Sequence, residues 1–381
     1  MTVIPYGRQT VTEEDIAAVR EVLVSDYLTQ GPAVPRFEAA ICAATGAEHA
    51  VATSSATGAL HIACLALGVG PGDMVWTVPN TFVASANAAL YCGADVDFVD
   101  INVDTWTMSV EALEAKLETT KRKPKVLIPV DLCGRPCDMA PLRALADKHG
   151  FAILSDSSHA IGASYRDSIV GDGRYADITV FSFHPVKIIT TAEGGAATTN
   201  DPALARRLDL LRSHGITRDP EEMTEPSHGG WYYQQIMLGY NYRMTDMQAA
   251  LGASQMTRLQ DIIARRHVLA RRYDEMLTSL PVRQPAPESN SRSALHLYPV
   301  LVPETQHSQV FAAMRAADIL VNLHYIPVHL QPFYRARGFA EGDFPNAEAY
   351  YRRAISLPMF PALTFELQDR VVAELGRALG A

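Results

Sequence analysis

The sequence predicts an α/β protein with a large domain, built on a mostly parallel sheet sandwiched by helices, and a smaller α+β domain at its C-terminal end. Short apolar runs alternate with helical patterns over most of the first 250 residues, as in a parallel sheet with helices on both faces. This rhythm stops near Gly239, where a long helical pattern follows. A chain of 381 residues also exceeds one ordinary small domain. We therefore predict domains at 1–250 and 251–381, with the first ~30 residues able to pack on the smaller one.

The first predicted element is a helix in "TVTEEDIAAVREVL", where Thr12 is a candidate N-cap and Asp15 follows three residues later. The run "HAVATSS" predicts a strand that leads into the helix "TGALHIACLALG". Helical patterns also occupy "SVEALEAKL" and "MAPLRALADKHG". The other predicted strands are the apolar runs "DMVWTVPNTF", "ADVDFVD", "KVLIPVDLCG", "FAILSDSS" and "DITVFSF".

The C-terminal part begins with "TDMQAALGASQMTRLQDIIARRHVLARRYDEML", which predicts a long and possibly interrupted helix. A connector rich in Pro and Ser follows, and then a strand, a helix, a strand and a final helix. These four elements are "LHLYPVLV", "QVFAAMRAAD", "ILVNLHYIP" and "ELQDRVVAELGRAL".

Composition narrows the classes of function. A formal net charge of −9 argues against nucleic acid or an anionic membrane as the main partner. We see no signal peptide and no apolar window long enough to span a bilayer. The five cysteines are an odd number in a large chain, which favours the reduced thiols of a cytoplasm. Cys133 and Cys137 form C-x3-C, which is not a usual zinc spacing; no second pair with matched His or Cys follows, and no metal is expected.

Several polar residues follow predicted strands, where open α/β sheets bind their ligands. In "ATSSATGAL", the small residues Ser55, Ala56 and Thr57 join a strand to a helix. Such a junction can bind phosphate through the free N–H groups of the helix start, or can simply cap the helix. Both readings stay open from this segment alone.

The segments "ILSDSSHAIGA" and "VFSFHPVK" offer three more candidates. Asp156 follows one strand and is either a helix cap or a ligand group, with His159 three residues on. Ser182 ends the next strand and precedes Lys187, which is flanked by Pro, Val and Ile. Desolvation lowers the pKa of such a lysine, and a neutral amine can form a Schiff base. The alternative is a lysine whose stem is buried while its amine reaches water.

Together these residues match what a pyridoxal phosphate enzyme requires. The phosphate needs N–H and hydroxyl donors, the pyridine nitrogen needs an acid, and the aldehyde needs a lysine. Phe82 in "PNTFVASANAAL" can cover one face of the ring, although an aromatic residue at a strand end is more often part of the core.

Two later segments carry polar and aromatic residues without an evident structural need. "LGYNYRMTDMQAALG" places Asn241 and Arg243 before a long helix, either at a subunit interface that completes a site or at a capped helix entry. "VNLHYIPVHLQPFY" contains His324, Tyr325 and His329; contacts with a hydroxyl-rich substrate are favoured there over a metal.

The chain resembles the DegT-like nucleotide-sugar aminotransferases, which are fold type I pyridoxal phosphate enzymes. The resemblance covers nearly the whole chain, and seven blocks occur in the family's order. The blocks are "SDYLTQGPAVPRFE", "SSATGAL", "TFVASANAAL", "SDSSHAIGASY", "FSFHPVKIITTAEGGAATTND", "GYNYRMTDMQAALG" and "LHYIPVH".

The resemblance implies a role for each candidate. Lys187 would carry the cofactor and move the proton, Asp156 would pair with the pyridine nitrogen, and Phe82 would stack on the ring. His159 would lie near the ring hydroxyl. The phosphate would be held by Ser182 with the segment Ser55, Ala56 and Thr57. Asn241 would reach the site of a second subunit, which implies a homodimer with shared active sites. The implied substrate contacts are Tyr6, Asp26, Tyr27, Leu28, Thr29, Asn241, His324 and Tyr325.

Within the family, "LTQGP", "SDSSHA" and "FSFHPVK" are most similar to the branch of pseudaminic acid biosynthesis. The implied reaction moves an amino group from L-glutamate to C4 of a UDP-linked 4-keto-6-deoxy-N-acetylhexosamine. Ile326 departs from that branch, whose members can carry Lys after the His-Tyr pair, so perosamine-type and 4-amino-4-deoxyarabinose-type aminotransferases stay open. A pyridoxal-phosphate-binding regulator without turnover is a remote alternative. Lys187 argues against the family's dehydratases, which have His in its place.

Overall fold

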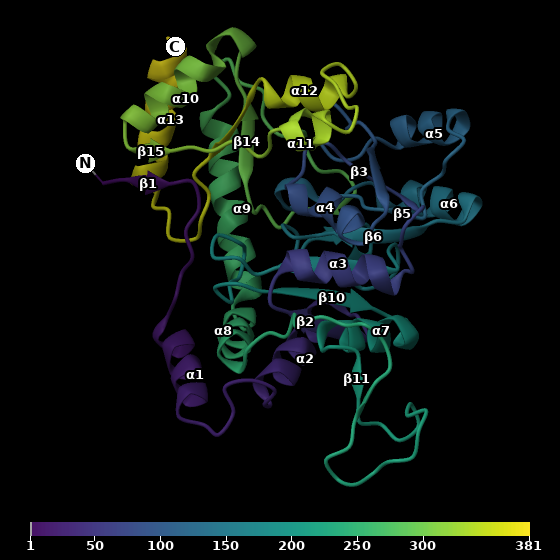
Figure 1. Ribbon diagram of the computed structural model, residues 1–381. Coiled ribbons are helices and arrows are strands. Elements are labelled where there is room, and N and C mark those ends of the chain that lie inside the picture. Colours follow the sequence, from purple (N-terminus) through teal and green to yellow (C-terminus); the bar gives the residue numbers. More distant parts are fainter. Residues whose placement is uncertain (1) are drawn as a thin grey trace.

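A computed structural model describes residues 2–381 and places a seven-stranded sheet at the centre of the chain (Figure 1). Strand β10 runs antiparallel to both of its neighbours, and the other neighbouring pairs are parallel. This confirms the predicted α/β class with its mostly parallel sheet. In spatial order the strands are β2 (His49–Thr53), β10 (Gly195–Thr199), β9 (Ile178–Ser182), β6 (Ala152–Asp156), β5 (Val126–Leu127), β3 (Met74–Thr77) and β4 (Asp95–Phe98).

Helices cover the sheet because alternate residues of its strands are apolar on both faces. Along β2, Val51 packs in the core that includes α3, while Ala52 packs in the core that includes α2 and α8. Because both faces of the sheet are buried, the strands appear in the sequence as nearly continuous apolar runs. The helices of this part are α2 (Ala33–Thr45), α3 (Ala56–Ala66), α4 (Val83–Tyr91), α5 (Val110–Thr119), α6 (Met139–His149), α7 (Pro202–Arg212) and α8 (Asp246–Met256).

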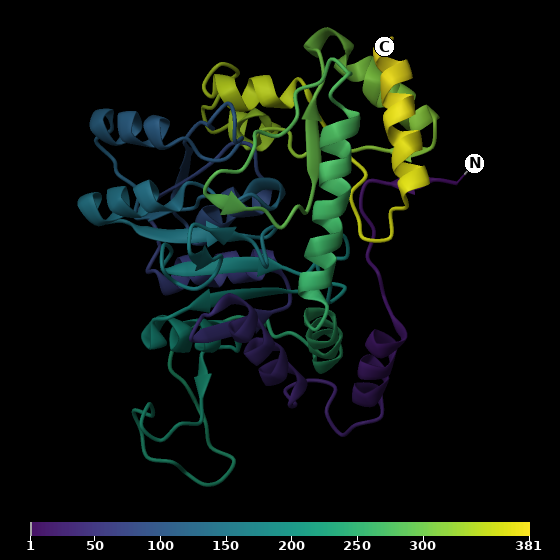
Figure 2. The ribbon, with the colours of Figure 1, turned by 180° about the vertical axis from the view of Figure 1, so that it is seen from behind.

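The smaller part surrounds a third apolar core and lies beside the upper end of the long helix α9 (Figures 1 and 2). Its strands are short: β14 pairs antiparallel with β16, and β1 pairs parallel with β15. The elements around this core are β1 (Ile4–Pro5), α9 (Leu259–Met276), β14 (Tyr298–Leu301), α10 (His307–Ala316), β15 (Ile319–Leu320), β16 (Ala354–Leu357) and α13 (Phe365–Leu379). Helices α11 (Pro332–Arg335) and α12 (Pro345–Tyr351) lie in the same part of the sequence but pack in the core that includes α3. No helix within residues 2–381 is long and apolar enough to cross a membrane.

Short strands and loops complete the chain. Strand β13 (Ser291–Arg292) pairs with β7 (Ser164–Tyr165), which pairs with β8 (Ser168–Ile169). Strands β11 (Ile216–Thr217) and β12 (Gln234–Gln235) form a small hairpin, and the loop between them projects away from the sheet (Figure 1).

The N-terminal helix α1 (Glu13–Leu23) confirms the capping box, since Asp15 accepts a hydrogen bond from the Thr12 N–H. The same carboxylate is fully buried and also accepts from Arg258, Ser254 and Gln255. Asp15 therefore both starts α1 and fixes it against the end of α8. Strand β1 pairs with β15 of the smaller part, and the carbonyls of Thr2 and Tyr6 also accept hydrogen bonds from that part, from Arg370 and Met359.

Helices α8 and α9 confirm that the long helical pattern is interrupted, at residues 257–258. The sequence places a domain boundary at residue 250, which lies inside α8. Because α8 packs on α1 and α2, we propose that the boundary lies instead between α8 and α9.

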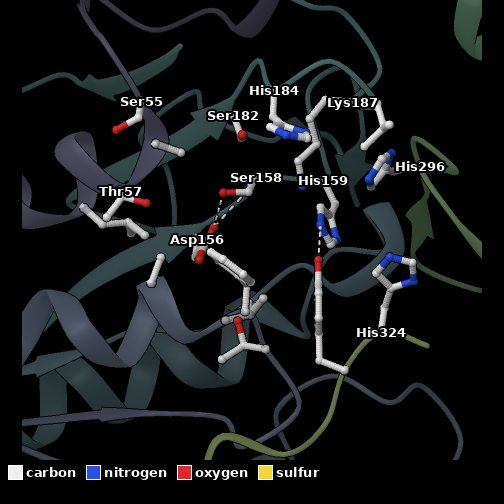
Figure 3. A pocket seen from close by; sticks show the side chains of 18 of the residues that line it. Ser55, Thr57, Asp156, Ser158, His159, Ser182, His184, Lys187, His296 and His324 are labelled. Carbon is white, nitrogen blue, oxygen red and sulfur yellow. Dashed lines mark hydrogen bonds between the residues drawn. The ribbon is translucent and has the colours of Figure 1, made fainter. Parts of the chain in front are cut away.

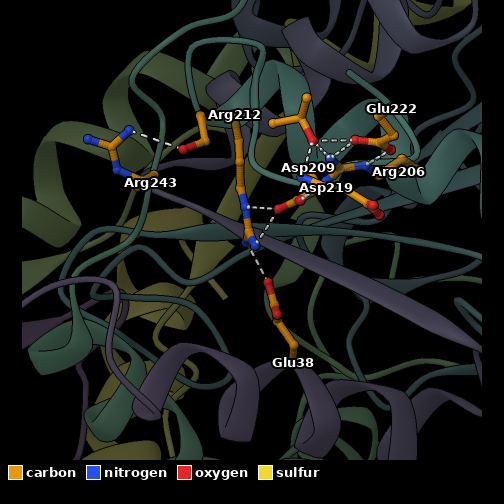
Figure 4. A network of polar contacts seen from close by, with 9 residues as sticks. Glu38, Arg206, Asp209, Arg212, Asp219, Glu222 and Arg243 are labelled. Atoms are coloured by element: carbon orange, nitrogen blue, oxygen red, sulfur yellow. Dashed lines mark hydrogen bonds and ion pairs between the residues drawn. The ribbon is translucent and has the colours of Figure 1, made fainter. Parts of the chain in front are cut away.

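The edge of the large sheet at β2 is covered by an ion pair (Figure 4). Glu38 accepts a hydrogen bond of 2.8 Å from the Ala52 N–H, and Arg212 donates one of 2.8 Å to the Ala52 carbonyl. Glu38 and Arg212 also pair with each other. The two side chains satisfy backbone groups that would otherwise be free to pair with another strand.

We expect Glu38→Ala to lower the free energy of unfolding by about 2 kcal/mol, because it removes hydrogen bonds to a charged group and leaves Arg212 only partly paired. Urea unfolding at neutral pH measures this loss. Glu48→Ala is the matched control, since Glu48 is exposed at the start of the same edge. A loss below about 0.5 kcal/mol, the usual range of surface substitutions, would contradict the proposed edge role.

Candidate active site

A cavity of about 590 Å³ opens beside the ends of β6 and β9 and contains most of the predicted site residues (Figure 3). It gathers side chains from the large sheet, from the N-terminal segment and from the irregular chain after β15. Eleven predicted residues line it: Tyr6, Ser55, Ala56, Thr57, Phe82, Asp156, His159, Ser182, Lys187, His324 and Tyr325.

One wall of the cavity is the start of α3. Ser55 is the N-cap, and its hydroxyl accepts from the Gly58 N–H at 3.1 Å. The N–H groups of Ala56 and Thr57 belong to the first turn, so they cannot pair within the helix and are free for an anion.

Strand β10 brings this wall against β9. A Cβ atom at Gly195 would lie 2.4 Å from the backbone nitrogen of Ala56, so only glycine allows the helix start to approach so closely. Gly195 is paired with Ser182, whose hydroxyl also lines the cavity. The close approach therefore gathers hydroxyl and amide donors at one end of the cavity, which fits a phosphate.

Asp156 lies at the end of β6 and is only 5% exposed. One carboxylate oxygen accepts from the Ser158 amide and hydroxyl, and the other accepts from the Ser85 hydroxyl. Phe82 precedes α4 and is 58% exposed, with its ring centroid 6.1 Å from that of Tyr325. The cavity thus has a fixed acid and a free aromatic face, as a protonated heteroaromatic ring requires.

Lys187 lies in the turn after β9, where its amide donates to the His184 carbonyl at 2.9 Å. Burial of the amine disfavours its charged form and lowers the pKa of Lys187 to about 8, although the negative charge of Asp156 and the Cys133 thiol oppose this shift. The amine is therefore more nucleophilic near neutral pH than an exposed lysine.

This pKa predicts how the cofactor-free protein captures pyridoxal phosphate. The neutral amine is the attacking form, so the capture rate should rise about tenfold per pH unit below 8 and level off above it. Stopped-flow absorbance after mixing with pyridoxal phosphate measures this profile. Nα-acetyl-lysine, the control, should keep rising toward pH ~10. A protein profile that follows the control would contradict a desolvated amine.

Besides His184, whose carbonyl accepts from the Lys187 amide, three histidines line the cavity near Lys187 (Figure 3). His159 accepts from the Cys133 N–H through Nδ1 at 3.1 Å, so its proton resides on Nε2, which lies 3.2 Å from the Tyr325 hydroxyl. Burial lowers the pKa of His159 and His296 well below the usual range and that of His324 to about 3. The three rings are therefore neutral hydrogen-bonding groups at pH 7.

Five predicted residues do not line the cavity: Asp26, Tyr27, Leu28, Thr29 and Asn241. The segment 26–29 lies beside the start of α8, because the Asp246 amide donates to the Leu28 carbonyl and Thr29 forms a bridge with Thr245. Tyr27 and Leu28 are about half exposed on this surface.

Sequence reasoning missed other residues of the cavity. Thr81 and Ser158 stand directly beside predicted site residues, so their strand-end positions could have revealed them. His296 follows a Pro/Ser-rich connector and carried no such signal. The further lining residues are Leu60, Thr81, Ala84, Val130, Ser158, His184, Val186, Glu193, Gly194, His296, Asn322 and Leu323.

The site fits pyridoxal 5'-phosphate: the start of α3 with Ser182 suits the phosphate, Asp156 the ring nitrogen, and Lys187 the aldehyde. The fold and the site thus define a pyridoxal phosphate-dependent aminotransferase of fold type I. The chain belongs to the DegT/DnrJ/EryC1/StrS aminotransferase family, which it matches over residues 9–376.

Similar proteins support this assignment along the whole chain. "Spore coat polysaccharide biosynthesis protein SpsC" of Bacillus subtilis is 38% identical over 97% of this chain and 95% of its own. The structure of PseC from Helicobacter pylori, an aminotransferase involved in the biosynthesis of pseudoaminic acid, superposes with a TM-score of 0.92 at 31% identity and covers both chains fully. Spr1654 of Streptococcus pneumoniae in its PMP form has a TM-score of 0.92, 31% identity and 99% coverage of both chains.

Proposed function

We propose that this protein moves an amino group from L-glutamate to C4 of a UDP-linked 4-keto-6-deoxy-N-acetylhexosamine, as the UDP-4-amino-4,6-dideoxy-N-acetyl-β-L-altrosamine transaminase of pseudaminic acid biosynthesis does. The observation that carries the proposal is the full-length similarity to PseC, together with a cavity that holds Lys187, Asp156 and Phe82. The similarity supports the aminotransferase chemistry, and the sugar is the part that needs testing.

The bound cofactor would supply an electron sink that stabilises the carbanion formed when a proton leaves the donor's α-carbon. Lys187 would hold the cofactor's aldehyde carbon and, when released, would carry that proton to and from carbon. Such a positioned amine typically contributes about 10²–10⁴-fold. Asp156 would keep the ring nitrogen protonated. The donor would leave as 2-oxoglutarate, and the same residues would serve the reverse steps on the keto sugar.

The neutral histidine and tyrosine side chains on one side of Lys187 suit a polar, uncharged sugar ring. Tyr6 and His324 lie with ring centroids 5.2 Å apart at one side of the cavity, and Tyr325 lines it beside them. These rings and their polar atoms can bind hydroxyl and keto groups without introducing a second charge near Lys187.

A different nucleotide-sugar 4-aminotransferase is the second candidate. Two observations favour it: SpsC, whose name refers to spore coat polysaccharide, is more similar in sequence than PseC, and Ile326 departs from the pseudaminic acid branch. The remote alternative is a cofactor-binding regulator that does not turn over.

A panel assay separates these candidates. The cofactor-loaded enzyme is mixed with glutamate and, separately, with UDP- and GDP-linked 4-keto sugars, and products are identified by NMR. The proposal expects amination of the UDP-linked 4-keto-6-deoxy-N-acetylhexosamine; preference for a GDP-linked 4-keto sugar would favour the perosamine type. If glutamate converts the cofactor to its amine form, the alternative of a cofactor-binding regulator without turnover is excluded.

We also propose a homodimer in which Asn241 of one subunit completes the site of the other. Asn241 is exposed, forms a bridge with Ser213, and stands near Leu238, which is 75% exposed. The segment 26–29 belongs to the same surface, because it contacts residues 245–246. These residues would then bind substrate across the interface.

Hybrid dimers test this arrangement. Lys187→Ala and Asn241→Ala chains are each expected to be nearly inactive, but co-expression should restore about a quarter of wild-type activity. Random pairing makes half of the dimers hybrids, each with one intact site. A mixture no more active than its parents would contradict sharing of Asn241.

A further inference from the structure

The Asp156 carboxylate is held by donors on both of its oxygens. The Ser158 amide and hydroxyl donate to Oδ1 at 3.1 and 2.6 Å, and the Ser85 hydroxyl donates to Oδ2 at 2.6 Å. Ser158 is a neighbour in sequence, but Ser85 is 71 residues away, in the first turn of α4. A short hydrogen bond to a carboxylate across this sequence distance fixes the orientation of the acid relative to α4.

A second hydroxyl orients the first. Thr81 and Ser85 have their hydroxyl oxygens 2.8 Å apart. The single Ser85 hydrogen is used toward Asp156, because that contact is much shorter than the 3.4 Å contact with the Phe82 carbonyl. Thr81 must then donate to Ser85, which gives the directed chain Thr81, Ser85, Asp156.

A serine in the first turn of a helix ordinarily caps the free N–H groups there, but the Ser85 hydroxyl does not cap α4. Ser85 is fully buried, and Thr81 is 2% exposed. Phe82 is the N-cap of the same helix. The ring proposed to cover the cofactor and the hydroxyl that bonds to Asp156 therefore come from one short segment of the chain.

We propose that Ser85, supported by Thr81, is a positioning residue that holds the Asp156 carboxylate aimed at the ring nitrogen of the cofactor. The inference rests on the proposed role of Asp156. Without the Ser85 hydroxyl, the carboxylate loses the donor that reaches it from α4. It is then free to turn away from the ring nitrogen and stabilises a proton there less well.

The first measurement needs no turnover. Wild-type and Ser85→Ala proteins loaded with pyridoxal phosphate are titrated from pH 5 to 10 while the visible absorbance is followed. A positive ring nitrogen favours loss of the proton on the lysine nitrogen, so weaker ring protonation should move the midpoint upward by about one pH unit in Ser85→Ala. The glutamate half-reaction should slow about 10- to 100-fold, with less than a threefold change in the half-saturating glutamate concentration.

A double-mutant cycle shows whether Ser85 acts through Asp156. In the Asp156→Asn background, Ser85→Ala should shift the midpoint by less than about 0.3 pH unit and change the rate by less than twofold, because the charge that Ser85 holds is already absent. Ser155→Ala is the matched control: Ser155 is 3% exposed on β6, and its hydroxyl bonds to Ser157 and not to the Asp156 carboxylate. It should leave the titration unchanged. Thermal melting establishes that each variant is folded.

Two results would overturn the inference: an unshifted midpoint in Ser85→Ala, or effects of Ser85→Ala and Asp156→Asn that simply add. The titration and the glutamate half-reaction use no sugar, so an error in the proposed sugar substrate leaves them intact. If Asp156→Asn itself leaves the titration and rate normal, the proposed role of Asp156 fails, and the inference fails with it; failure of Ser85 alone leaves Asp156 in place.

Discussion

Lys187→Ala is expected to abolish the visible absorbance of the lysine-bound cofactor and to lower turnover by at least about 10⁴-fold. On the proposed roles of Lys187, the variant would lose both the covalent attachment and the group that moves the proton, and no second lysine is among the cavity's lining residues to replace it. Absorbance of the cofactor-loaded protein and the rate with glutamate measure the two losses separately.

The same variant should remain folded. At pH 7 the wild-type structure keeps the Lys187 amine largely in its charged form although burial disfavours that form, so removal of the amine relieves a cost. Thermal melting is expected to show no loss of stability. Lys148→Ala is the control, because Lys148 is exposed at the end of α6. Wild-type turnover by Lys187→Ala would refute the central assignment.

Asp156→Asn is expected to bind the cofactor but to lose about 10²–10⁴-fold in rate. The amide oxygen would face Ser158, because the Ser158 N–H can only donate. The amide NH₂ would then face Ser85, whose hydroxyl must turn to accept. An amide cannot stabilise a positive ring nitrogen as a carboxylate does, so the cofactor would lose most of its capacity to hold the carbanion's charge.

Rate and cofactor content should be measured together for this variant. Cofactor released by denaturation is quantified by absorbance, and the glutamate half-reaction is followed by rapid mixing. Asp147→Asn serves as control, since Asp147 forms only an exposed helical ion pair with Arg143. Near-normal rates in Asp156→Asn would remove the proposed role of this acid.

Much of the fold was predictable because its signals are local. The capping residues of α1, the apolar strands and the helical periods of α5 and α6 are all legible in the sequence. Helix α2 was not predicted: Pro35 within it suggests a break, but it occupies the first turn, where its missing N–H is not needed. Strand β10 was also missed, because a buried strand built from Gly, Ala and Thr lacks the usual β-forming residues.

The segment with His324 and Tyr325 shows the limit of periodicity. The sequence predicts a strand through this region, but β15 ends at Leu320 and the chain continues irregularly. The His324 ring instead bonds to the Ser356 hydroxyl at 2.9 Å, and the Tyr350 hydroxyl donates to the His324 carbonyl. These tertiary contacts override the local β preference and direct both side chains toward the cavity.

The sequence by itself determined the chemical set of the site and the order of its members along the chain, because strand ends, helix starts and a desolvated lysine are local features. Only the tertiary structure decided which groups orient these residues. The Ser85 hydroxyl donates to Asp156, the Cys133 N–H donates to His159, and Gly195 lies against the backbone of Ala56. Each of these pairs joins segments many residues apart, and neither partner's sequence neighbourhood specifies the other. Their meeting depends on how the strands align in the sheet and how the helices pack upon it.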